Sequence, residues 1–135
     1  MSNMFSSSCP AELIALLRAI VEAKFHNDPN DLEVPGSPIL ARVAIRIRDE
    51  VIAEAVDRGG AAAEETWREW MNLGPDREEW ATAKKYAAAT WRSAWGKWSD
   101  TDRRTAAEDL LSPFKPDEAT MIKFLDEVAA AIEHI

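Results

Sequence analysis

The chain has 135 residues, of which 47% are hydrophobic and 30% are charged. This length and composition are typical of one globular domain and exclude a disordered or membrane-spanning protein, so we predict a single domain over residues 1–135. The formal net charge of −8 repels duplex phosphates and favours basic partners. No uncharged window approaches the ~18 residues that a transmembrane helix needs.

The N-terminal stretch and the single cysteine indicate where the protein works. Residues 1–9 are rich in serine and are predicted to form a loose N-terminus, and they lack the basic and apolar regions of a secretory signal. Cys9 is the only cysteine, so no disulfide can form within the chain. We therefore expect a cytoplasmic protein that does not bind a membrane.

The first half of the chain predicts two helices separated by a long loop. Apolar residues at helical spacing predict a helix over residues 10–25, with Lys24 on the same stripe as the leucines. Three prolines and one glycine predict a long Pro-rich loop over residues 26–38. Ser37 then provides an N-cap and Pro38 a first helical residue.

The second predicted helix runs from residue 38 to about residue 58 and stops at the two glycines that follow. Apolar residues cover more than half of the circumference of this helix, so we expect the helix to lie at the centre of the bundle. Residues 43–48 alternate between apolar and basic side chains, which also fits a strand. The apolar register that continues to residue 56 favours a helix.

Capping signals divide the rest of the chain into four further helices. Gly74 and Pro75 end the helix that begins after the glycine pair, and Ser99 or Asp100 caps a later one. These features predict an all-α fold, a compact single-domain bundle of five to six helices. The four predicted helices cover residues 61–73, 76–98, 100–111 and 115–135.

Tryptophan is unusually frequent, with six residues in the chain. Trp67 and Trp70 lie just before the predicted helix 76–98, and the other four belong to it. Those four recur at helical spacing and form one stripe roughly 80° wide. Such residues are often core, but six exceed what a small bundle needs, so we interpret several as exposed anchors. The stripe consists of Trp80, Ala87, Trp91, Trp95 and Trp98.

The residue types needed for catalysis or metal binding do not assemble in this sequence. His26, His134 and Cys9 form no recognised ligand spacing or nucleophile motif. Adjacent carboxylates on a helix point about 100° apart, so the acidic doublets are not acid/base pairs. We therefore predict no catalytic residue, no metal and no cofactor, and a protein that is not an enzyme.

The remaining hypothesis is recognition of another protein that carries a basic surface. Tryptophans with a neighbouring arginine are predicted to anchor the partner, and carboxylates near them to form an acidic rim. By physical analogy alone, such a protein suits the inhibition or neutralisation of a nucleic-acid-handling partner, because its carboxylates can stand in for phosphates. The predicted anchors are Trp67, Trp70, Trp91, Arg92, Trp95 and Trp98. The predicted rim consists of Glu64, Glu65, Glu69, Asp100 and Asp102.

Three alternatives use the same tryptophans. Segment 80–104 interleaves them with basic residues, as single-stranded nucleic-acid binders do, although the neutral charge of the segment makes nucleic acid an unlikely partner. A Trp-lined pocket between helices would accept a small apolar ligand. A tryptophan stripe buried between two copies of the chain would form a symmetric homodimer. The basic residues of the first alternative are Lys85, Arg92, Lys97, Arg103 and Arg104.

Overall fold

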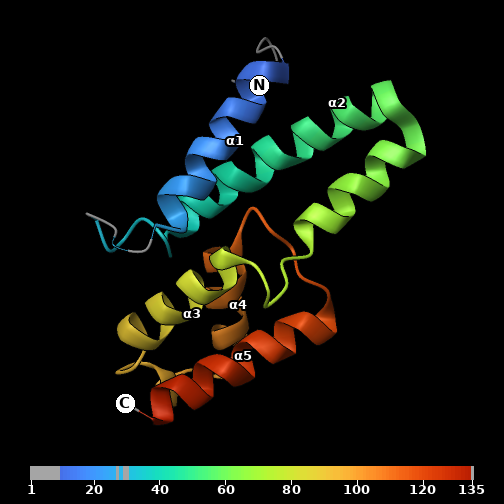
Figure 1. Cartoon of the computed structure of the whole chain (residues 1–135). Helices are drawn as coiled ribbons and strands as arrows, with labels where there is room; N and C mark the ends of the chain where they lie inside the picture. Colours follow the sequence, from blue (N-terminus) through green and yellow to red (C-terminus); the bar gives the residue numbers. More distant parts are fainter. Residues whose placement is uncertain (1–9, 27, 29–30, 135) are drawn as a thin grey trace.

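The computed structural model of the protein describes residues 10–26, 28 and 31–134. Within these residues the fold is all-α and has no strand, which confirms the predicted fold class (Figure 1). The loose N-terminus predicted for residues 1–9 lies outside the described part of the chain. The helices are α1 (Pro10–Lys24), α2 (Pro38–Met71), α3 (Glu78–Thr90), α4 (Asp100–Leu111) and α5 (Glu118–Glu133), and a 3-10 turn, η1, covers Trp95–Lys97.

Helix α2 bends sharply at Gly60, where φ is 65° and ψ is −145°. A positive φ is readily adopted only by glycine, so the glycine pair does interrupt the helix as predicted. We call residues 38–59 the first arm of α2 and residues 61–71 the second arm. Figure 1 shows the second arm folding back from the tip of the first. Residues 43–48 lie in the first arm and are helical.

Helix α1 packs along the first arm of α2. The contact is a small apolar core in which Leu13 and Leu17 meet Ile47 and Val51. Helix α2 also contacts α4, and Arg48 of the first arm donates to the Pro113 carbonyl just after α4, so the first arm lies between α1 and the C-terminal helices. The predicted central position of this helix therefore holds for the first arm, whereas the second arm bends away at Gly60 and returns to the edge of the cores through Trp67 and Trp70.

A larger core lies between α3, α4 and α5. Trp80 is only 1% exposed, and its ring packs edge-on against Phe124 with centroids 5.1 Å apart. Its indole Nε1 donates a hydrogen bond to Glu127 Oε1 at 3.1 Å. Trp70 packs against this core and also against the α1/α2 core, so it joins the two.

The predicted helix over residues 76–98 is wrong in its second half. Helix α3 ends at Thr90, and the chain then turns through η1 before α4 begins. The tryptophans at 91, 95 and 98 therefore do not continue the line that starts at Trp80. The physical reason is that these indoles pack on one another and on α4 once the chain turns back.

Two predicted caps are present with the expected geometry. The Ser37 hydroxyl oxygen accepts a hydrogen bond from Leu40 N at 3.1 Å, which begins α2. Ser99 caps α4 and exchanges hydrogen bonds with Asp102 in a capping box. The loop before Ser37 is tied to α3, because the Tyr86 hydroxyl donates to the Leu32 carbonyl at 2.6 Å.

Candidate functional site

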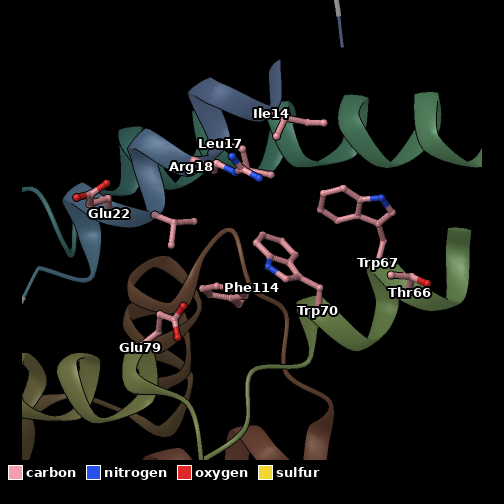
Figure 2. A pocket seen from close by; sticks show the side chains of 10 residues that line it. Ile14, Leu17, Arg18, Glu22, Thr66, Trp67, Trp70, Glu79 and Phe114 are labelled. Carbon is pink, nitrogen blue, oxygen red and sulfur yellow. The ribbon is translucent and has the colours of Figure 1, made fainter. Parts of the chain in front are cut away.

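An apolar groove of about 560 Å³ lies between α1 and the second arm of α2 (Figure 2). The indoles of Trp67 and Trp70 project from the second arm toward α1, and Phe114 lies beside Trp70. A concave, mostly apolar site with a few charged groups is the usual form of a binding site. We call it the α1/α2 groove, and it is lined by Ile14, Leu17, Arg18, Val21, Glu22, Thr66, Trp67, Trp70, Glu79 and Phe114.

The aromatic wall of the groove is held in place from below. Trp67 and Trp70 meet edge-on with ring centroids 5.3 Å apart, and Trp70 lies 4.7 Å from Phe114. Arg77 supports this wall from α3's N-terminal side: its Nη1 donates to the Trp70 carbonyl at 2.8 Å. Its guanidinium also lies 4.8 Å from the centre of the Phe114 ring. Trp67 and Trp70 both remain half-buried, so the wall is preformed and accessible.

A second hollow, of about 630 Å³, continues the groove toward the C-terminal end of α1. The two hollows share Val21, Glu22 and Glu79, so they adjoin each other along α1, and we call the pair the channel. The second hollow differs from the first because carboxylates dominate its charge. Its lining residues are Val21, Glu22, Phe25, His26, Glu78, Glu79, Ala81, Thr82 and Lys85.

The carboxylates of this channel differ in their partners. Glu79 lies 3.6 Å from Arg77, so its charge is partly compensated. Glu22 and Glu78 form no ion pair or side-chain hydrogen bond with any described residue. Glu78 lies in the first turn of α3, where the helix dipole favours a negative charge. The two unpaired carboxylates therefore remain available to a positively charged group.

The other three predicted tryptophan anchors form a separate cluster. Trp91 is stacked on Trp95 with centroids 6.2 Å apart, and Trp98 lies 5.7 Å from Trp91. Trp91 is only 7% exposed and belongs to the α3/α4/α5 core, whereas Trp95 and Trp98 are half-buried. Arg103 closes the cluster: its guanidinium lies 4.4 Å from the Trp95 ring centre and donates to the Trp95 carbonyl at 2.7 Å.

The structure thus divides the predicted anchors into two places. Trp67 and Trp70 line the α1/α2 groove, and Trp91, Trp95 and Trp98 cluster between α3 and α4. Arg92, the remaining predicted anchor, is exposed. The basic residues proposed for single-strand binding do not converge on one tryptophan face. Lys85 lines the second hollow beside α1, while Arg103 is engaged by Trp95.

The predicted acidic rim is also divided between two elements. Glu64 and Glu65 in the second arm both face Arg68, with the closer contact of 2.8 Å made by Glu64. Glu69 is exposed on the same arm. The remaining rim residues, Asp100 and Asp102, lie in the first turn of α4, and the Asp102 carboxylate is used in the cap. Glu22 and Glu78 were missed, because only the fold brings α1 and α3 together.

Sequence reasoning also missed a buried cation at the end of α1. Lys24 is 1% exposed, and its Nζ donates to the carbonyls of Asp109 at 2.7 Å and Ser112 at 2.5 Å, and to the Ser112 hydroxyl. Burial lowers the pKa of Lys24 to about 7, and the attraction of Asp109 opposes that shift. The signal was present in the sequence, because Lys24 lies on the apolar stripe of its helix.

Other properties of the described part of the chain bear on function. It contains no group of three or more His, Cys, Asp or Glu side chains placed to hold a metal ion. None of its helices combines the length and apolar character needed to cross a membrane. Comparison of the chain with models of protein families, with curated proteins and with solved structures finds no match.

Proposed function

We propose that the protein is a non-enzymatic protein-binding module that accepts an apolar segment of a basic partner in the α1/α2 groove. The observation that carries this proposal is the half-buried pair Trp67 and Trp70, held in a preformed apolar groove at the surface of a protein with net charge −8. Aromatic anchors in a groove with a charged edge are typical of protein recognition. The net charge favours a basic partner because opposite charges accelerate encounter.

Trp67 is the better anchor of the two. It packs against the edge of the α1/α2 core only, whereas Trp70 packs against both cores and its carbonyl is tied to Arg77. Removal of Trp70 would therefore disturb the fold, and removal of Trp67 would mainly alter the groove. A function in inhibiting or neutralising a nucleic-acid-handling protein is consistent with a basic partner and is part of this proposal.

The proposal is tested by selecting binders from a displayed library of random 16-residue peptides on the immobilised full-length chain. The enriched peptides are then synthesised with a fluorescent label, and their affinities are measured by anisotropy. We expect Trp67→Ala to weaken binding at least tenfold, because a central aromatic anchor contributes about 2 kcal/mol or more. Trp95→Ala is the matched control, since it removes a half-buried indole elsewhere, and it should leave binding unchanged.

A second groove variant protects this test against loss of folding in Trp67→Ala. Ile14 is half-buried on the opposite wall, so Ile14→Arg places a positive charge in the groove and should repel a basic partner. Circular dichroism verifies that each variant is folded. Failure to enrich any peptide, or equal binding to the wild-type and both groove variants, would overturn the proposal.

The groove volume also suits a small apolar ligand, which is the second candidate function. A small ligand would require only the aromatic wall, whereas a protein segment would also use the acidic part of the channel. Binding of a polarity-sensitive apolar dye that is lost in Trp67→Ala, with no peptide enriched, would favour the small ligand.

A further inference from the structure

We infer that the partner segment is an amphipathic α-helix of about three turns, with apolar side chains beside Trp67 and basic side chains beside Glu22 and Glu78. This inference rests on the proposed function and specifies the partner of the same groove. It follows from three properties of the channel, which are its length, the absence of a sheet edge and its uneven charge.

The channel has the length of a short helix. Its two hollows follow α1 from Ile14 to the end of that helix at Lys24. At a rise of about 1.5 Å per residue, these ten steps span about 15 Å, which is close to three helical turns. A helix laid beside α1 would contact the second arm of α2 on its other side.

A helix also satisfies the hydrogen bonds of its own backbone. An extended peptide gains affinity by adding a strand to an exposed sheet edge, and the described residues contain no strand to supply one. The peptide groups of an extended segment in this groove would therefore lose their water against the apolar wall and find no hydrogen-bond partner. A helix avoids this cost and presents side chains at i, i+3, i+4 and i+7 to the groove.

The charge of the channel defines which end of the partner helix is basic. Near Ile14 the lining is apolar apart from Arg18 and Thr66, and the indole of Trp67 provides a large apolar contact surface. Near the end of α1 the lining carries three glutamates and one lysine, Lys85, and two of the glutamates, Glu22 and Glu78, have no partner among the described residues. Lysine or arginine side chains at that end of the partner would pair with these carboxylates, and acidic side chains would be repelled.

The pattern of the selected peptides tests the helix directly. We expect the enriched sequences to carry apolar residues at i, at i+3 or i+4, and at i+7, with Lys or Arg residues at one end of this pattern. We also expect the peptides to gain a helical circular dichroism signal when they bind. Replacing one central residue of such a peptide by proline should weaken binding at least tenfold, because proline disrupts a helix interior by about 3 kcal/mol. Enriched peptides without helical spacing, or tolerance of the proline, would overturn the inference.

The charge assignment is tested with a pair of isosteric variants. Glu22→Gln combined with Glu78→Gln should weaken the basic peptides roughly tenfold at low ionic strength and reduce the dependence of their affinity on salt. The control is Asp126→Asn combined with Glu133→Gln, which removes two exposed carboxylates of α5 outside the groove lining and should have little effect on either quantity. Equal effects of the two pairs would overturn the assignment.

The outcomes separate this inference from the proposed function. If Trp67→Ala abolishes binding but the peptides are neither helical nor sensitive to Glu22 and Glu78, the groove binds proteins and the inferred partner is wrong. If Trp67→Ala has no effect, the proposed function itself fails.

Discussion

Lys24 at the end of α1 and Asp109 near the end of α4 are joined by a hydrogen bond of 2.7 Å from the lysine Nζ to the aspartate carbonyl. The carbonyl groups in the last turn of a helix lack partners within the helix, so a cation placed there satisfies them and interacts favourably with the helix dipole. Lys24 also binds the carbonyl of Ser112, directly after α4. This buried side chain therefore fastens α1, one wall of the groove, to the C-terminal helices.

The stability of the protein is predicted to rise with pH above neutrality because of Lys24. The pKa of Lys24 is about 7 in the folded protein, and its usual value, which applies to the unfolded chain, is 10.5. Between pH 7 and 10.5 the unfolded chain therefore binds more protons than the folded protein. Linkage then gives a rise in the free energy of unfolding of up to about 1.4 kcal/mol per pH unit. The measurement is urea denaturation of the wild-type protein and of Lys24→Met at several pH values between 7 and 10. The free energy of unfolding of the wild-type protein, minus that of the variant, should increase with pH.

Two other charged groups act near Lys24 and must be separated from it. Burial raises the pKa of the Asp109 carboxyl, and attraction from Lys24 and Arg42 opposes that shift. The variant Asp109→Asn removes this carboxyl, so the same denaturation series separates its titration from that of Lys24. Parallel curves for wild-type and Lys24→Met protein across this range would show that Lys24 does not titrate there.

The bend in α2 is predicted to depend on Gly60. Its φ of 65° is unfavourable for any residue with a Cβ, so Gly60→Ala should reduce the free energy of unfolding by about 1–3 kcal/mol. Gly96→Ala is the control, because a Cβ there meets no atom within 4 Å and its φ is not positive. Urea denaturation should show a loss in the first variant only, and an equal response in both would contradict the role of the bend.

The hydrogen bond from Trp80 to Glu127 is predicted to stabilise the α3/α5 contact. Trp80→Phe keeps an aromatic ring beside Phe124 but removes the indole N–H and part of the buried surface. We expect a loss of about 1–3 kcal/mol in the free energy of unfolding. Trp98→Phe is the matched control, because its half-buried indole donates no hydrogen bond to a described residue. Thermal and urea unfolding should rank Trp80→Phe as the less stable protein.

The capping box at the start of α4 is predicted to contribute about 1 kcal/mol through Ser99. Ser99 Oγ accepts from Asp102 N at 3.1 Å, and the Asp102 carboxylate accepts from Ser99 N at 3.3 Å. Ser99→Ala should therefore lower stability, and Ser99→Asp should largely retain it because aspartate is also a good N-cap. The nearby exposed Thr101→Ala serves as a surface control. No difference between Ser99→Ala and this control would contradict the role of the cap.

Much of the local structure could be predicted from short stretches of sequence. Ser37 and Ser99 each accept a hydrogen bond from the backbone N–H three residues further along the chain. Gly60 interrupts α2 because glycine readily adopts a positive φ. The amphipathic spacing in α1 likewise depends on neighbours one turn away. These signals are local in space as well as in sequence, which is why the all-α fold and most helix boundaries were correct.

The candidate site could be predicted only in part. Trp67 and Trp70 were predicted as anchors from the size and frequency of the tryptophans, but nothing in their neighbourhood indicates that α1 faces them. Glu22 and Glu78 are separated by more than fifty residues, and no local pattern relates them. The division of the tryptophans into a groove and a separate cluster required the positions of whole helices.

The sequence by itself therefore determined the helices, their caps and the break at Gly60, because backbone hydrogen bonding and apolar periodicity act over one or two turns. Only the tertiary structure decided the end of α3 at Thr90. There the packing of Trp91, Trp95 and Trp98, with the Arg103 guanidinium on the Trp95 carbonyl, outweighs a helical pattern that would otherwise continue. Contacts within residues 91–98 and with Arg103 of α4 supply that energy, and they exist only when the chain has folded.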